Sequence, residues 1–514
     1  MCKKMIFVVS FVLVLGLSGN VSADLTSQRD IVVSHIANNN QAQANGALGQ
    51  LLAEFAGHER LPHTVHKIAE QCHESGTADR AKHLFQNALP EQAKSPQVIW
   101  LQMGLAISNI LLENGNAAWT SIEHLLYDFS ADDRCAEAVG QVAWCYRKLE
   151  EHENARTLYR HVVDNWPDKP RAIFSQRGIV FISLSVGNVT EAEAATEKLL
   201  SRFSQDEHLP KVVSTIAEKY QGLEEYEKAI ELHQYVLDNH PDSDQAIFSQ
   251  SGVIISSIEL GDDSRAEAGI DELLSQFSSN EHIAKVAYQV ARKLNKKDDT
   301  KAQELYEYVI DNLPSDEHAA LARVNIGQIQ LRLSNDAAAR SIFDGVLSDF
   351  SGHSILPIAV SLMAEGYWDQ AWSERMQGLD IKADDHFTKS LDEWEIVITQ
   401  FAEIPFTTAQ AYHFAGDCYR HFKVYEKAIE YYQTVADNWP DYKSAWYTQF
   451  MVGQTYKQLK LAGDIPVSKA ESEIESAFRQ LLRDYPDCQA TGAARTWLNY
   501  YNNKKNRQRE RGPR

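Results

Sequence analysis

Small and aromatic residues recur along this chain at the spacings of a helix pair, most clearly between residues 416 and 440. The positions there are Gly416, Tyr419, Ala428, Tyr432, Val435 and Pro440. Steps of three and four residues place the first two on one face of a helix and the next three on one face of a second helix. Pro440 ends the second helix, because proline has no N–H and disfavours a helical residue before it. The stretch therefore predicts two antiparallel helices.

The same order of residues occurs twice more in full. The copies are Ala143, Tyr146, Ala155, Tyr159, Val162 and Pro167, and then Ala217, Tyr220, Ala229, His233, Val236 and Pro241. A partial copy from Ala302 to Pro314 keeps only the second helix. A small residue on one helix and an alanine on the next let two axes approach closely, and the aromatic residue fills the space beside them. One pair cannot bury both its faces alone, so the pairs are expected to stack.

This ladder resembles the tetratricopeptide repeat family, in which a small residue, tyrosine, alanine, an aromatic residue and proline recur in units of about 34 residues. The resemblance implies an all-α fold, a right-handed α-solenoid of about twelve antiparallel helix pairs wound into a superhelix. The composition agrees, because proline is scarce and strand-type alternation of apolar residues is nearly absent.

A longer period overlies the helix pairs. Phenylalanines recur at intervals of 73 or 74 residues, at Phe55, Phe129, Phe203, Phe277 and Phe350. Between them lie Pro90, Pro167, Pro241 and Pro314. Residues 24–352 are therefore predicted to form an array of duplicated two-pair units, with one pair closing at a proline and the other at a phenylalanine. In the phenylalanine-closed pairs, the loops near Gly187 and Gly261 are expected to be about two residues longer.

Two stretches interrupt this rhythm. Residues 353–403 are expected to form an irregular helix pair with a loop inserted around 373–385, and a second insert is expected at 461–468. Residues 404–502 are predicted to hold the C-terminal repeats and a capping helix. Residues 503–514 are basic and are predicted to form a disordered tail.

The N-terminus has the segment order of a secretory signal peptide. Two lysines, Lys3 and Lys4, precede an apolar run from Met5 to Leu17, and the small residues Val21-Ser22-Ala23 follow as a cleavage site. We expect residues 1–23 to be removed and no transmembrane span to remain, because the apolar run is shorter than the roughly 20 residues that a span requires. An uncleaved N-terminal anchor is the alternative.

A second resemblance concerns location. From Tyr431 to Trp497 the chain has Asn438-Trp439-Pro440-Asp441, Ala445, Tyr485-Pro486-Asp487 and Ala493-Ala494. This spacing resembles the exported bacterial tetratricopeptide proteins of the outer-membrane assembly and cell-envelope coordinator type. The resemblance implies a periplasmic or secreted protein of the bacterial envelope.

Charge and motif content exclude several classes of function. The formal net charge of −21 argues against nucleic acid or an anionic membrane surface as the main partner. The chain has no G-x-x-x-x-G-K-[ST] loop, no G-x-S-x-G elbow and no H-E-x-x-H motif. We therefore expect no enzymatic activity and no cofactor.

Histidines and cysteines give little support for a metal site. One helix face carries His63, His66, Glu70 and His73 at steps of three, four and three, which is a metal-ligand spacing. Yet the 18 histidines are scattered through the chain, and Leu61-Pro62 marks this stretch as an ordinary repeat helix. No cysteines form a C-x-x-C pair, so neither a zinc site nor a disulfide framework is expected.

The first helix of each pair is expected to line the concave surface of the solenoid. By resemblance to the family, a peptide ligand is expected to contact one face of these helices. The candidate peptide-binding residues are Trp144, Arg147, Lys211, Glu218, His413, Asp417 and Arg420. A solvated surface with no single ligand is the alternative. The Lys and Asn pattern of chaperone-binding clamps is absent, because Gly140 and Trp144 occupy two of its places.

These features predict an exported, non-enzymatic scaffold that mediates protein–protein interactions in the cell envelope through its concave groove. The alternative is an accessory subunit of an envelope enzyme or of a polysaccharide assembly or export machine, with glycan contact through the tail and the inserts.

Overall fold

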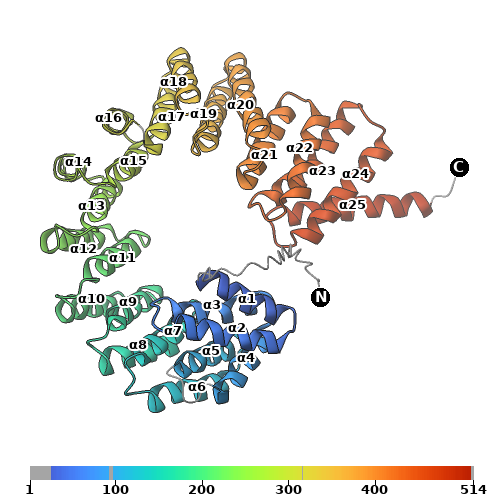
Figure 1. Cartoon of the computed structure of the whole chain (residues 1–514). Helices are drawn as coiled ribbons and strands as arrows, with labels where there is room; N and C mark the ends of the chain where they lie inside the picture. Colours follow the sequence, from blue (N-terminus) through green and yellow to red (C-terminus); the bar gives the residue numbers. More distant parts are fainter. Residues whose placement is uncertain (1–24, 92–96, 315, 511–514) are drawn as a thin grey trace, which may run out of the picture. The chain divides into compact units, whose positions relative to one another are not determined.

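The computed structural model describes residues 25–91, 97–314 and 316–510. These residues form helices α1 to α25 and contain no strand (Figure 1). The predicted all-α fold of stacked helix pairs is therefore confirmed. The predicted signal peptide, residues 1–23, lies outside the described residues. No helix among those described is long and apolar enough to cross a membrane.

The chain divides into two compact units, Met1–Ala246 and Ile247–Arg514. Unit 1 contains α1 (Leu25–Ala37), α2 (Gln41–Glu54), α3 (Leu61–Glu74), α4 (Ala78–Glu91), α5 (Val98–Leu111), α6 (Gly115–Asp128), α7 (Cys135–Lys148), α8 (His152–Asn165), α9 (Pro170–Ser185), α10 (Val189–Arg202), α11 (Leu209–Gln221) and α12 (Tyr226–Asn239). The division falls inside the predicted array of residues 24–352.

The boundary between the units falls directly after Ala246, the first residue of α13, so the rest of this helix belongs to unit 2. Unit 2 contains α13 (Ala246–Leu260), α14 (Asp263–Gln276), α15 (Ile283–Leu294), α16 (Asp299–Asn312), α17 (Glu317–Arg332), α18 (Asp336–Asp349), α19 (Leu356–Met376), α20 (Asp380–Gln400), α21 (Pro405–His421), α22 (Tyr425–Asn438), α23 (Ala445–Ala462), α24 (Val467–Asp484) and α25 (Thr491–Glu510).

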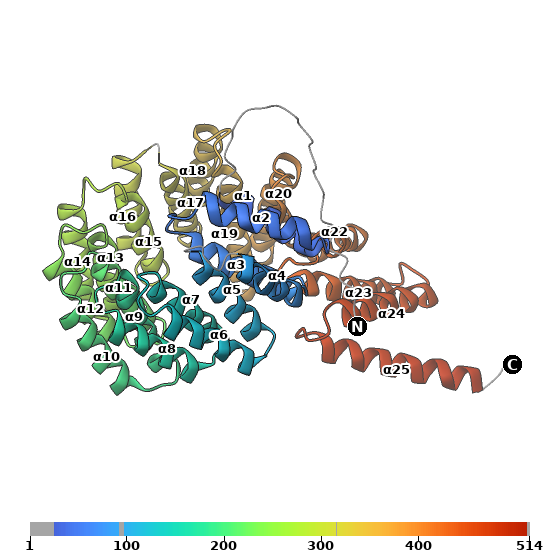
Figure 2. The same cartoon turned by 60° about the horizontal axis from the view of Figure 1, so that its bottom comes forward.

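Each unit is built from helix pairs that follow the order of the chain. In unit 1 every odd-numbered helix packs against the even-numbered helix after it, and α15 to α24 pair in the same way in unit 2. Figure 2 shows α3, α5, α7 and α9 in succession within unit 1, and these first helices also contact one another. A single apolar core runs through unit 1 from Leu25 to Val236. Stacking thus buries the face that one pair alone leaves exposed.

The close approach that the ladder predicts is present. A Cβ atom placed on Gly416 of α21 would lie 2.9 Å from the ring of Tyr432 on α22, and one on Gly178 of α9 would lie 2.5 Å from the ring of Tyr159 on α8. Both rings are fully or nearly fully buried. Glycine is therefore required where an aromatic ring packs directly on the neighbouring helix backbone.

The alternation of helix ends is confirmed by the positions of the caps. The five phenylalanines that repeat at 73 or 74 residues are the C-terminal caps of α2, α6, α10, α14 and α18. Helices α8, α12 and α16 end two residues before a proline. Pro90 differs, because it lies inside the last turn of α4, which runs to Glu91.

Three buried glutamines mark the repeat in a way that the sequence analysis missed. Gln102, Gln176 and Gln250 stand 74 residues apart, each on the first helix of a phenylalanine-closed pair. Their Nε2 atoms donate hydrogen bonds to the backbone carbonyls of Ser121, Ala195 and Gly269, at 3.4, 2.7 and 2.9 Å. Each bond joins the two helices of its pair at the same place, 19 residues apart in the chain.

The predicted loop insertions are wrong, because the additional residues lengthen helices. In the 353–403 segment, α19 and α20 each have 21 residues and are joined by a turn at residues 377–379. The insert at 461–468 likewise lengthens α23 and α24 to 18 residues each, and Gly463 supplies a left-handed cap at φ +82°. Near Gly187 the loop is also short, and α9 has 16 residues where α7 has 14.

The predicted disordered tail is also corrected over residues 503–510, which continue helix α25. The physical reason is charge pairing with α24. Lys504 Nζ lies 2.7 Å from Glu471 Oε1, and Lys505 Nζ lies 2.6 Å from Glu475 Oε2. Residues 511–514 lie outside the described residues.

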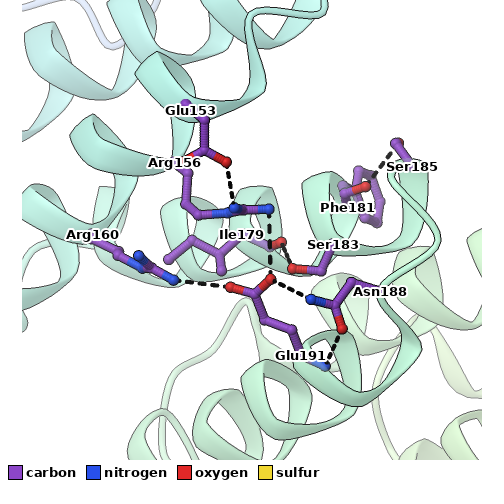
Figure 3. Close-up of polar contacts among 9 residues, drawn as sticks. All are labelled: Glu153, Arg156, Arg160, Ile179, Phe181, Ser183, Ser185, Asn188 and Glu191. Carbon is purple, nitrogen blue, oxygen red and sulfur yellow. Dashed lines mark hydrogen bonds and ion pairs between the residues drawn. The ribbon is translucent and has the colours of Figure 1, made fainter.

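Ion pairs also join the second helices of neighbouring pairs. Glu191, in the first turn of α10, lies 2.9 Å from Arg160 and 3.5 Å from Arg156 of α8 (Figure 3). Asn188 caps α10 by accepting a hydrogen bond from the Glu191 N–H at 3.2 Å, and its own amide donates to the Glu191 carboxylate. This reciprocal cap fixes the start of α10 against α8.

Candidate functional site

Two of the predicted peptide-binding residues, Trp144 and Arg147, line a pocket in unit 1. The pocket has a volume of about 330 Å³ and lies between α3, α7, α8 and α9. We call it the arginine pocket. Its lining includes Trp144, Arg147, Tyr159, Arg171, Phe174, Arg177 and Phe181, together with His63, Gln141 and Gly178.

The arginines of the pocket differ in their partners. Arg171 Nη1 lies 3.2 Å from Glu137 Oε1, and this carboxylate also accepts a hydrogen bond from Gln141 at 2.9 Å. Neither Arg147 nor Arg177 forms an ion pair with a carboxylate of the described residues. The pocket therefore holds more positive charge than its carboxylate neutralises.

Aromatic rings hold the two unpaired guanidinium groups. The Arg177 guanidinium lies 5.3 Å from the ring centroid of Phe174 and 5.7 Å from that of Phe181. The Arg147 guanidinium lies 5.8 Å from the centroid of Phe181. Cation–π contacts of this kind restrict the orientation of arginine while leaving its N–H groups free to donate.

Burial and neighbouring charges shift the pKa values of Tyr159 and Arg177 in the pocket. Burial raises the pKa of the Tyr159 phenol, and Arg147, Arg171 and Arg177 all oppose this shift. Burial lowers the pKa of Arg177; Tyr159 raises it, whereas Arg147 and Arg171 lower it further. These three guanidinium groups are close enough to repel one another, so an anion between them would be stabilised.

Trp144 also connects two repeats. Its ring lies 4.6 Å from the ring of His66 on α3, and Lys148 lies over it at 5.0 Å. Lys148 forms an ion pair with Glu70 of α3 at 2.5 Å. Burial raises the pKa of Glu70, but hydrogen bonds from Lys148 and Lys67 outweigh it and lower the value to about 2. Helices α3 and α7 are therefore joined directly, although α5 lies between them in the chain.

The histidine face on α3 takes part in this packing. Burial lowers the pKa of His66 to about 3, so its ring is neutral at neutral pH. Within the described part of the chain, no group of three or more His, Cys, Asp or Glu side chains is placed to hold a metal ion.

In unit 2 the structure corrects the prediction for His413 and Asp417, which are buried. Asp417 is 6% exposed and accepts hydrogen bonds from the hydroxyls of Tyr432 at 2.5 Å and Tyr447 at 3.3 Å. His413 Nδ1 lies 3.2 Å from the hydroxyl of Tyr442. Tyr442 precedes α23 and Tyr447 lies in its first turn, so the following pair covers the face that was expected to bind peptide. Arg420 is half-buried beside this network.

The remaining predicted residues, Lys211 and Glu218, are exposed on α11. Neither forms an ion pair within the described residues. The structure therefore brings Trp144 and Arg147 into one pocket, and places the other five candidates elsewhere.

Two segments of the chain match a known protein family. The sequence profile described as tetratricopeptide repeat matches residues 141–169 and 415–442. These two segments are similar to tetratricopeptide repeats. The first contains Trp144, Arg147 and Tyr159 of the arginine pocket, and the second contains Asp417, Arg420 and Tyr432. The search of curated proteins finds no match.

Two solved structures align with nearly the whole chain. One is yeast Tom70, with 11% identity, a TM-score of 0.38, and coverage of 94% of this chain and 96% of that chain. Another is the APC/C hetero-tetramer Cut9-Hcn1, with 12% identity, a TM-score of 0.28, and coverage of 93% and 96%.

The α9 side of the pocket was missed by the sequence analysis. Arg171, Phe174, Arg177 and Phe181 lie at steps of three, three and four, so they share one helix face. They belong to a phenylalanine-closed pair, which departs from the ladder of the tetratricopeptide repeat. The alternation of arginine and phenylalanine on one face is the signal that could have identified them.

Proposed function

We propose that this protein is a non-enzymatic scaffold that binds segments of other proteins, with the arginine pocket of unit 1 as a principal contact. The observation that carries the proposal is the pocket itself: Arg147 and Arg177 present unpaired guanidinium groups beside aromatic rings. Arginine and aromatic side chains dominate the binding energy of protein interfaces. The tetratricopeptide repeat at residues 141–169 supports the proposal, because stacked helical repeats offer extended binding surfaces.

We further propose that the scaffold acts after export, in the bacterial envelope. The support is the order of basic, apolar and small residues over residues 1–23. N-terminal sequencing of protein recovered from the periplasm or medium is expected to begin at Asp24. A chain recovered from the membrane fraction with Met1 retained would indicate an uncleaved anchor.

The scaffold proposal is tested by cross-linking and pull-down from envelope extract. Wild type is expected to recover a defined set of proteins, and Arg147→Ala is expected to reduce their yield. Lys198→Ala is the matched control, because Lys198 of α10 is an exposed cation of the same unit outside the pocket. Equal recovery by all three proteins would contradict a role for the pocket.

Sedimentation with purified peptidoglycan separates this proposal from an accessory role in a polysaccharide machine. The scaffold is expected to stay in the supernatant. Saturable co-sedimentation, reduced by Lys504→Ala or by truncation after residue 502, would favour the accessory role instead.

A further inference from the structure

The arginine pocket is positively charged, whereas the chain as a whole is acidic. The protein has 71 acidic and 50 basic residues, yet three arginines converge on one pocket. Among the described residues, Glu137 is the carboxylate that pairs with them, through Arg171. The pocket therefore retains positive charge in a protein that is otherwise acidic.

We infer that the arginine pocket binds the carboxylate of an acidic side chain in an extended protein segment, with an adjacent apolar residue of that segment on its aromatic walls. This inference rests on the proposed scaffold function and specifies the ligand. It concerns Arg147 and Arg177 as the carboxylate-binding residues, with Trp144, Phe174 and Phe181 as the apolar contacts.

The N–H groups of the pocket are suited to a carboxylate. Neither Arg147 nor Arg177 pairs with a carboxylate of the described residues, and both are held by ring contacts at 5.3 to 5.8 Å; Arg147 also forms a hydrogen bond with Tyr159. The buried Nε of Arg171 donates to no atom of the described residues, although its Nη1 contacts Glu137. A guanidinium group can bind both oxygens of one carboxylate, and such charge-assisted bonds are roughly twice as strong as neutral ones.

The size and walls of the pocket favour a side chain over a larger ligand. A volume of about 330 Å³ admits one acidic side chain with part of its neighbour. Tyr159 also lines the pocket; it is 3% exposed and packs on Gly178. Because the walls are aromatic, water is partly excluded, and the attraction between guanidinium and carboxylate is less screened than at an open surface.

A carboxylate suits the site better than a phosphate group. Arg171 already holds a carboxylate, that of Glu137, at the rim. A phosphorylated side chain would use the same guanidinium groups, so the experiment compares both.

The experiment selects peptides from a random display library on the full chain. Wild type is expected to enrich peptides with Asp or Glu beside an aromatic or aliphatic residue. Selection on Arg177→Met is expected to lose the acidic position while retaining apolar ones. Arg292→Met is the matched control in unit 2, because Arg292 also lies over an aromatic ring, that of Tyr288 at 5.9 Å. It is expected to leave the enrichment unchanged.

Affinity measurements on one enriched peptide complete the test. Replacement of its Glu by Gln is expected to weaken binding to wild type by about tenfold or more. The same replacement is expected to have little further effect on binding to Arg177→Met, because the partner of the carboxylate is already removed. If Arg177→Met does not fold, the Glu and Gln peptides on wild type decide the question, since neither alters the protein.

The outcomes separate the inference from the function on which it rests. Enrichment of peptides without an acidic position, or equal affinity for the Glu and Gln copies, would overturn the carboxylate site and leave the scaffold proposal standing. A phosphoserine copy that binds more than about tenfold tighter than the Glu copy would overturn the assignment to a carboxylate. Failure to enrich any peptide would contradict the scaffold proposal itself.

Discussion

The repeats at 141–169 and 415–442 share one ladder of residues, but the same helix face lines a pocket in the first and is buried in the second. In the first, Trp144 and Arg147 line a pocket together with residues of α9. In the second, Asp417 is buried under Tyr432 and Tyr447 and hydrogen-bonds to both. The position directly after the small residue is thus a pocket wall in one repeat and part of the core in the other. The side chains of the next helix pair decide whether this position is exposed or buried.

The largest expected effect tests the core of unit 2. Tyr432→Ala removes a fully buried ring and leaves the Asp417 carboxyl without its shortest hydrogen bond. We expect unit 2 to lose about 3 to 5 kcal/mol of unfolding free energy, measured by hydrogen exchange of α21 and α22. Tyr432→Phe should lose less, since the ring remains. A loss below about 1 kcal/mol for Tyr432→Ala would show that the face is not a packed core.

A second prediction concerns acidification, which should act on the two units in opposite directions. In unit 1, burial lowers the pKa of His66 to about 3, so its contribution to stability is lost as pH falls below about 6.5, where the unfolded ring gains a proton. In unit 2, burial raises the pKa of Glu393 to about 7 from 4.5, so its contribution is present below 4.5 and is lost as pH rises through 7.

Hydrogen exchange of each unit between pH 4.5 and 7.5 measures these opposite slopes. Each group is expected to change the unfolding free energy of its unit by several kcal/mol across its window. The controls are His66→Gln in unit 1 and Glu393→Gln in unit 2, each of which should flatten the slope of its own unit alone. Parallel slopes that neither substitution changes would contradict the expected difference between the units.

A smaller effect is expected from the glycines that the rings pack upon. Gly178→Ala places a Cβ atom 2.5 Å from the Tyr159 ring, whereas Gly416→Ala places it 2.9 Å from the Tyr432 ring. Both should destabilise by about 1 to 3 kcal/mol in thermal unfolding, with the larger loss at Gly178. Gly345→Ala in α18 is the control, because a Cβ atom there meets nothing within 4 Å. It should stabilise by about 0.5 to 1 kcal/mol, and a loss instead would argue against the helical placement.

The smallest effect is expected at Glu218, which occupies the equivalent position in α11. Its side chain is exposed, so Glu218→Ala should change the unfolding free energy by no more than about 0.5 kcal/mol. Asp417→Ala should cost more, because it leaves two tyrosine hydroxyls without their acceptor. Equal losses of unfolding free energy for Glu218→Ala and Asp417→Ala in chemical denaturation would contradict the difference in burial between the two positions.

The fold could be predicted from the sequence because the ladder depends on local spacing. Gly416, Tyr432 and Pro440 sit within one pair, so their roles in close packing and termination follow from helix geometry alone. The lengths of α19 and α20 could not be predicted in this way. A loop was predicted around residues 373–385, but Gly378 supplies a single left-handed residue in a short turn there, at φ +77°.

The candidate site was predictable only in part. Trp144 and Arg147 were found from the ladder, whereas Arg171 and Arg177 belong to a pair that lacks it. His413 and Asp417 were misplaced because their burial depends on Tyr442 and Tyr447, which lie 29 and 30 residues later in the chain than the residues they contact. Exposure of a repeat face depends on the next repeat, and a single-repeat pattern holds no information about it.

The glutamines at 102, 176 and 250 have a consequence for how such a chain can change in length. Each joins the two helices of its own pair by a bond whose ends lie 19 residues apart, so none of these three bonds crosses the boundary between two blocks. Loss or gain of one block of 74 residues would therefore leave the glutamine bond of every remaining pair intact. The chain can thus change in length by whole blocks while the internal hydrogen bond of each block is kept.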